Sequence, residues 1–186
     1  MPIVEAHILE GYSSQDKARL SSALTDAVRL VVPAPDEAIT VLLREYASED
    51  YARGGSRRTP APASPDPKGV VLGYLDAMAA RDTETASGFL SVGFEMRFPG
   101  SGPMTRLQEL IAWSKDRYRF VTKTNEAVEA FQSGRTTCVF VRGTLAGTWP
   151  DGTVFDGIRF VDRFEIEDGL ITRQDVWNDL AETRAQ

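Results

Sequence analysis

The sequence predicts a chain of two units: an α/β unit built from one β-α-β motif, and an α+β unit in which three helices pack on a curved antiparallel sheet. Three observations lead to this prediction. Over the first fifty residues, apolar positions alternate, then repeat at helical spacing, then alternate again. A proline-rich stretch follows. After it come helical patterns and then long alternating segments separated by hairpin turn signals.

The first unit spans residues 1–55. Residues 2–9 are predicted to form a strand, Ser13 begins a helix, and residues 39–46 form a second strand. The two strands should pair in parallel through a right-handed crossover. Two strands and one helix bury little apolar surface, so we expect a homo-oligomer in which other copies cover the sheet.

Residues 56–67 read as a linker, because they carry four of the ten prolines and no large apolar side chain. The second unit spans residues 68–182. Its first helix should begin at Pro67 with Asp66 as the N-cap. Further helices are expected after Thr83 and Thr105, the second of these capped by Thr105, and four long strands follow.

The bulk composition excludes several classes of function. The net charge of −6 disfavours nucleic acid as a partner, because phosphate binding needs clustered cations. No apolar run approaches the length of a membrane span, and the amino terminus does not resemble a signal peptide. One histidine and one cysteine, Cys138, make a metal site improbable and fit a reducing, cytoplasmic location. No cofactor is expected.

The first unit resembles the 4-oxalocrotonate tautomerase family. The spacing of the strand, helix and loop agrees throughout, and the matching residues are Pro2-Ile3, His7-Ile8-Leu9-Glu10-Gly11, Ser13, Ala34-Pro35, Tyr51 and Gly54-Gly55. The resemblance implies that Pro2 is catalytic once Met1 has been removed. A free α-amino group titrates near neutral pH, and an apolar pocket lowers its pKa further. Such an amine is suited to move a proton next to a carbonyl group.

The resemblance also implies where the substrate binds, and there this chain differs from the family. Tyr12 and Thr40 stand where family members carry arginines that hold carboxylates. Tyr51 stands where the family has a phenylalanine that keeps the proline pocket apolar. We therefore expect a small carbonyl substrate that is not a dicarboxylate, with Tyr12, Thr40 and Tyr51 in contact with it.

The second unit resembles the NTF2-like superfamily, particularly SnoaL-like cyclases and ketosteroid isomerase. The element order supports this resemblance, as do five short motifs at residues 70–75, 79–82, 98–99, 161–166 and 168–171. It implies a cone with a pocket between its helices and its sheet.

The same resemblance implies chemistry in that pocket. Tyr74 stands where ketosteroid isomerase has its oxyanion-hole tyrosine, and Asp162 where it has a neutral, hydrogen-donating aspartic acid. Phe98 replaces the family's catalytic base. Asp175 shares a strand face with Trp177, and we expect both to line the mouth of the cavity, with Asp175 as a substitute base. The expected pocket residues are therefore Tyr74, Phe98, Asp162, Asp175 and Trp177. A satisfied hydrogen-bonded pair of Tyr74 and Asp162 is the structural alternative.

Three functions are consistent with these residues. The leading hypothesis is a tautomerase that uses Pro2 for keto–enol proton transfer, with the second unit binding ligand, assembling copies or catalysing a second step. Catalysis of the polyketide cyclase or dehydratase type in the second pocket is an alternative. The third is a non-catalytic protein that binds a small molecule, with both inherited sites impaired.

Overall fold

The structure, a computed structural model, describes residues 1–184 and confirms the mixed α/β fold class. It divides into two compact units, residues 1–63 and the residues from 64 onward. In the described residues, no helix has the length and apolar character needed to cross a bilayer.

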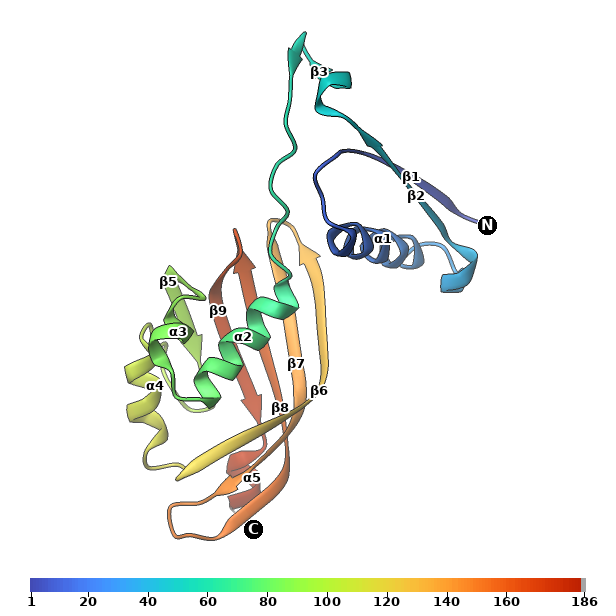
Figure 1. The fold of residues 1–186 in the computed structure, drawn as a ribbon. Helices are drawn as coiled ribbons and strands as arrows, with labels where there is room; N and C mark the ends of the chain where they lie inside the picture. The colour runs from blue at the N-terminus through green and yellow to red at the C-terminus, as the bar shows by residue number, and fades with distance from the viewer. Residues whose placement is uncertain (185–186) are drawn as a thin grey trace. The chain divides into compact units, whose positions relative to one another are not determined.

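The first unit is built on two parallel strands and one helix (Figure 1). Ile3 of the first strand lies opposite Thr40 of the second, which sets the register of the whole pair. A two-stranded antiparallel hairpin follows. In chain order the elements are β1 (Ile3–Leu9), α1 (Ser14–Arg29), the 3-10 turn Asp36–Ala38, β2 (Thr40–Tyr46), the 3-10 turn Ser48–Asp50, β3 (Ala52–Arg53) and β4 (Ser56–Arg57).

The start of α1 is where the sequence predicts it. The Ser13 hydroxyl accepts a hydrogen bond from the backbone N–H of Asp16 at 3.1 Å. In return the Asp16 carboxylate accepts from the backbone N–H of Ser13 at 3.2 Å. This reciprocal capping box satisfies two backbone donors that a helix otherwise leaves unpaired.

The predicted linker is partly structured. Ser56 and Arg57 pair with Arg53 and Ala52 in the β3–β4 hairpin. The turn between these strands is made by Gly54 and Gly55, both with positive φ, a conformation that glycine adopts without strain. The composition of the stretch did not indicate this hairpin, because each strand contributes only two paired residues, too few to show an alternating pattern.

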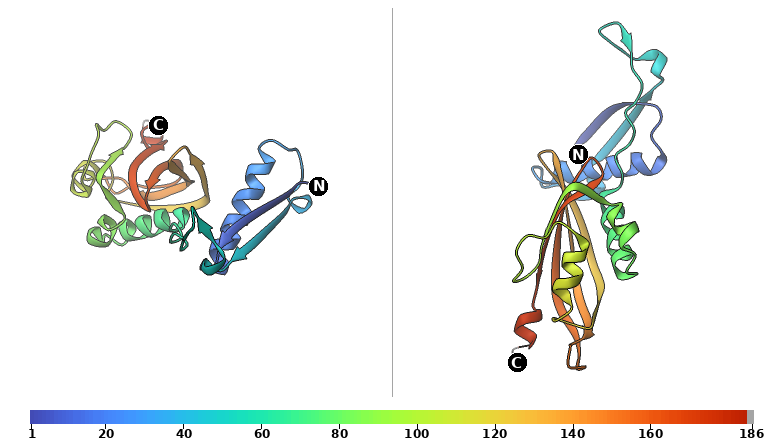
Figure 2. Two further views of the ribbon diagram at one scale, coloured as in Figure 1. Left: turned by 90° about the horizontal axis from the view of Figure 1, so that it is seen from above. Right: turned by 90° about the vertical axis from the view of Figure 1, so that its left-hand side faces the viewer.

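The second unit is a five-stranded curved sheet with helices on one face (Figures 1 and 2). The strand order is β5-β9-β8-β7-β6, with β5 parallel to β9 and the other neighbours antiparallel. Its elements are α2 (Pro67–Ala79), α3 (Thr83–Ser87), β5 (Leu90–Arg97), α4 (Leu107–Ser114), β6 (Phe120–Ser133), β7 (Thr136–Thr148), β8 (Val154–Glu167), β9 (Leu170–Asn178) and α5 (Leu180–Arg184).

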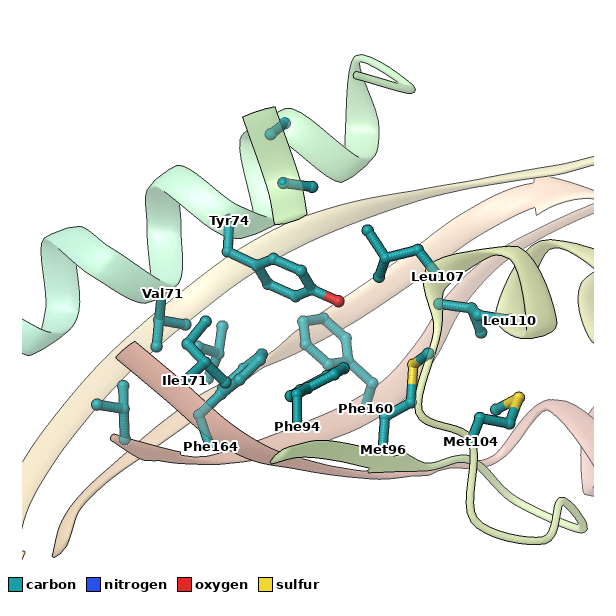
Figure 3. Packing of buried hydrophobic residues seen from close by; sticks show 14 of the residues in the cluster. Val71, Tyr74, Phe94, Met96, Met104, Leu107, Leu110, Phe160, Phe164 and Ile171 are labelled. Carbon is teal, nitrogen blue, oxygen red and sulfur yellow. The ribbon is translucent and has the colours of Figure 1, made fainter. Parts of the chain in front are cut away.

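The core lies between α2 and the inner face of this sheet. The ring of Tyr74 points from α2 toward Phe94 and Phe160 (Figure 3). The same ring meets Phe164 edge-on, with 6.0 Å between ring centroids. These buried side chains fix the helix against the strands.

Two helix starts test the predicted caps. Asp66 caps α2 as predicted, accepting from the backbone N–H of Lys68 at 3.3 Å. The cap assigned to Thr105 is wrong, because α4 begins one residue later, after Arg106. There the carboxylate of Glu109 reaches back and accepts from the backbone N–H of Thr105 at 2.8 Å. The carboxylate of the third helical residue thus holds the start of α4, in place of the predicted threonine hydroxyl.

Candidate functional site

Pro2 directly precedes β1 and is half-buried. Its carbonyl oxygen accepts a hydrogen bond from the backbone N–H of Thr40, at 3.0 Å, so the first residue of β2 lies beside it. The structure therefore brings Pro2 and Thr40, two of the predicted site residues, together at the amino ends of the parallel strands. Met1 lies outside this pairing, with 91% of its surface exposed.

Tyr12 and Tyr51 lie at the other end of the unit. Tyr12 follows the carboxyl end of β1, and Tyr51 comes after β2 and its following 3-10 turn (Figure 1). A strand of seven residues spans roughly 20 Å. One copy of the chain therefore does not place either tyrosine next to Pro2. The hydroxyl of Tyr51 instead accepts from the guanidinium of Arg53 at 3.4 Å.

The second unit contains a pocket inside the cone. Its empty space is about 340 Å³, open solvent at the mouth included. Phe98 lines it, as expected, and so do Trp113 and Tyr118. The remaining apolar lining is Val121, Leu145, Phe160, Val176 and Leu180, and the polar lining is Lys123, Asp162 and Asn178.

Asp162 is the centre of a buried polar chain that reaches this pocket. Its carboxylate oxygen Oδ2 forms an ion pair with the ammonium group of Lys123, which also lies over the ring of Phe160 at 4.5 Å. The same oxygen accepts from the Gln174 amide nitrogen at 3.4 Å, while the Gln174 amide oxygen accepts from the Tyr74 hydroxyl at 3.1 Å. Asp162 thus accepts hydrogen bonds in this arrangement, whereas the resemblance implies a donor.

Tyr74 supports the pocket from behind without lining it. Its ring is almost fully buried, and its hydroxyl reaches Asp162 only through Gln174. Burial, and to a lesser extent the charge of Asp162, raise the pKa of Tyr74 above its usual value. The hydroxyl therefore stays protonated and remains a donor to Gln174.

Asp175 and Trp177 lie on the outer face of the sheet, not at the pocket. Asp175 accepts from Arg173 at 2.7 Å and 3.1 Å and from Arg163 at 3.4 Å. The hydrogen bonds from Arg173 to Asp175 raise the pKa of the Arg173 guanidinium, so this guanidinium stays protonated. Trp177 is 54% exposed. The expectation that Asp175 and Trp177 line the pocket is wrong, because the alternation of β9 turns Gln174 and Val176 inward and turns Asp175 and Trp177 outward.

Sequence reasoning missed Lys123 and Gln174. Lys123 follows Val121 at the two-residue spacing of one strand face, and both line the pocket. Gln174 precedes Val176, which lines the pocket, at the same two-residue spacing. The period-two pattern would have placed both on the inner face, but a polar residue in such a pattern ordinarily indicates the solvent face.

Family comparisons define a chain made of a tautomerase-type unit and an NTF2-like cone. Residues 2–59 match the family described as tautomerase enzyme, and residues 71–174 match the SnoaL-like domain family. The chain belongs to the SnoaL-like domain family and carries a tautomerase-family domain before it.

Curated relatives match the first unit over nearly their whole length. A probable tautomerase of Listeria innocua is 42% identical over 59 residues, which are 32% of this chain and 97% of the relative. A probable tautomerase of Bacillus cereus is 39% identical over 57 residues, which are 31% of this chain and 93% of the relative. The second unit is thus an addition to what these relatives contain.

Solved structures match the second unit. TerC, crystallised with polyporic acid, aligns with a TM-score of 0.54 and 19% identity, over 64% of this chain and 97% of that one. An NTF2-like protein from Burkholderia pseudomallei aligns with a TM-score of 0.52 and 20% identity, over 62% of this chain and 92% of that one. At these identities the likeness establishes the fold only.

Proposed function

We propose that the first unit catalyses keto–enol tautomerisation of a small carbonyl compound, with Pro2 as the acid–base group. The observation that carries this proposal is the tautomerase-family match that begins at Pro2 itself. Removal of Met1 exposes a secondary amine. In its neutral form this amine takes a proton from the carbon next to the carbonyl, and the resulting ammonium returns a proton at the other end of the enol system.

The substrate is held by groups other than an arginine pair. Thr40 lies beside Pro2 through its backbone N–H. Tyr12 and Tyr51 lie at the far end of the strands, so a second copy of the chain has to bring them to Pro2. We therefore propose a homo-oligomeric enzyme in which each site is shared between copies, acting on a substrate without two carboxylates.

The test pairs intact-mass determination with keto–enol assays on phenylpyruvate and 2-hydroxymuconate. The mass should show that Met1 is absent. Pro2→Ala should lower the rate by about a hundredfold or more, as expected when a positioned acid–base group is lost. Pro33→Ala, in the exposed loop after α1, is the matched control and should keep the wild-type rate. Equal rates in wild type and Pro2→Ala would exclude this mechanism.

A second candidate function is proton transfer in the pocket of the cone, of the cyclase or dehydratase type. The observation that favours it is the Asp162 carboxylate, which lines an otherwise mainly apolar pocket. Activity that survives Pro2→Ala and disappears in Asp162→Asn would support this candidate. If the wild-type chain binds carbonyl compounds but turns none of them over, that result would support the third hypothesis, a non-catalytic small-molecule binding protein.

A further inference from the structure

The side chain of Arg53 is held against the tyrosine that the tautomerase resemblance places at the substrate. Its guanidinium nitrogen Nη2 donates to the Tyr51 hydroxyl at 3.4 Å. The backbone of Tyr51 is extended and leads directly into β3, so the two-residue spacing puts both side chains on the same face. An assembly that brings Tyr51 to a site therefore brings the Arg53 guanidinium with it.

Arg53 has no carboxylate partner within its own copy. Other arginines of the first unit do form ion pairs with carboxylates, namely Arg19, Arg29 and Arg44. Among residues 1–184 no ion pair includes Arg53, although Asp50 lies only a few positions before it in the chain. A guanidinium binds a carboxylate through two parallel N–H···O bonds. Arg53 is therefore able to receive a carboxylate from outside this copy.

The β3–β4 hairpin separates Arg53 from the arginine nearest to it. Arg57 lies opposite Ala52, the neighbour of Arg53 in β3. Because side chains alternate along a strand, Arg57 projects from the other face of the hairpin. Arg58 lies beyond the last paired residue, and no hydrogen bond among the described residues joins it to Tyr51. The tyrosine thus has a single guanidinium bonded to it, which favours a ligand with one carboxylate over a ligand with two.

We infer that Arg53 binds the substrate carboxylate in the tautomerase site, and that the substrate is a keto acid with a single carboxylate. This inference rests on the proposed function, because the hairpin of another copy has to bring Tyr51 and Arg53 to Pro2. The guanidinium holds the carboxylate and so fixes the enolisable carbon of the substrate beside the Pro2 amine. Arg53 thus supplies, from a different position, the charge that is missing at Tyr12 and Thr40.

The test compares phenylpyruvate with its methyl ester, which keeps the ring and the enolisable ketone but lacks the negative charge. Ketonisation of both compounds is assayed with the full chain. Arg53→Gln should lower kcat/KM for phenylpyruvate by about tenfold or more, chiefly by raising KM, as expected when a charged hydrogen bond is lost. The loss for the ester should be much smaller, because the ester has no charge for Arg53 to bind. Arg57→Gln removes an equal charge from the other face of the hairpin and should change neither substrate.

Equal losses for the acid and the ester in Arg53→Gln, or no loss for either, would overturn the inference and leave the proposed role of Pro2 standing.

Equilibrium binding separates the two proposals, because it needs no proton transfer. The probe is 3-phenylpropanoate, which has the ring and the carboxylate but no ketone, measured by titration calorimetry. It should bind Arg53→Gln about tenfold more weakly than wild type or Arg57→Gln. Full activity in Pro2→Ala together with this weaker binding would overturn the proposed function and keep Arg53 as a carboxylate site. Equal binding to wild type and Arg53→Gln, or no saturable binding to wild type, would overturn the inference about Arg53.

Discussion

Tyr74 links the core of the cone to its pocket. Its ring packs among buried aromatic side chains, and its hydroxyl orients Gln174, which in turn donates to Asp162. Burial and the nearby carboxylate raise the pKa of Tyr74. The folded state therefore keeps this proton at pH values where an unfolded tyrosine, with a pKa near 10, gives it up.

Tyr74→Phe should change how stability depends on alkaline pH. Because the folded pKa is raised, the wild-type contribution of Tyr74 is fully present below about pH 10 and is lost as pH rises above it, at about 1.4 kcal/mol per pH unit. The phenylalanine variant has no hydroxyl to ionise, so its free energy of unfolding lacks this dependence on alkaline pH. Near pH 8 it should be less stable by about 1–2 kcal/mol, because the Gln174 oxygen loses its donor.

Urea unfolding followed by tryptophan fluorescence measures this effect, because all three tryptophans lie in the second unit. The free energies of unfolding of wild type and Tyr74→Phe should converge between about pH 10 and pH 11. Parallel pH profiles for the two proteins would show that Tyr74 ionises equally in both states.

Side-chain alternation accounts for what the sequence could and could not reveal about the pocket. It placed Asp162 on the face of Phe160 and Phe164, where the structure has it. It grouped Asp175 with Trp177 correctly but did not show which face was inner. The pairing of Lys123 with Asp162 was not predictable, because it joins β6 to β8 across β7 and depends on the register of both pairs.

The pairing of β6 with β7 depends on a close approach at Gly143. A Cβ atom at this position would lie 1.9 Å from the carbonyl oxygen of Thr124 and 3.0 Å from the backbone nitrogen of Glu126. The register of β6 shifts at this point, between Asn125 and Ala127. The bulge brings the β6 backbone over a position that only glycine can occupy.

Gly143→Ala should therefore destabilise the second unit strongly, by about 3 kcal/mol, because the backbone of β6 must move to admit the methyl group. Gly93→Ala is the matched control, since Gly93 lies in β5 with nothing within 4 Å of the added Cβ. The control should stay within about 0.5 kcal/mol of wild type. Urea unfolding by tryptophan fluorescence measures both, and similar stabilities for the two variants would contradict the steric argument.

Elements with local signals were predictable, and pairings between distant segments were not. Ser13 and Asp66 identified two helix starts, because an N-cap acts within three residues of itself. The parallel pairing of β5 with β9 joins segments about eighty residues apart. No local pattern specifies such a partner, and the antiparallel sheet expected from the hairpin turns did not include it.

At the scale of the whole molecule, the two units differ in how well they bury their own surface. The second unit has a continuous buried core. Within residues 1–63 no side chain is fully buried, and the sheet face opposite α1 exposes Ile3 by 63% and Leu42 by 41%. A unit of this size that leaves two large apolar side chains exposed on its sheet has little stability of its own. Its folding should therefore be coupled to association with other copies.

Thermal unfolding of the full chain should show this coupling as a dependence on concentration. Circular dichroism reports both units, whereas tryptophan fluorescence reports only the second. The transition seen by circular dichroism but not by fluorescence belongs to the first unit. Its midpoint temperature should rise by about 10 °C between roughly 2 and 200 µM protein, because association stabilises the folded copies by mass action. Leu42→Lys places a charge on the exposed sheet face and should lower that transition, whereas Val92→Lys, at a fully exposed position of β5, should not. Coincident transitions that do not move with concentration would mean that the first unit is stable as a single copy.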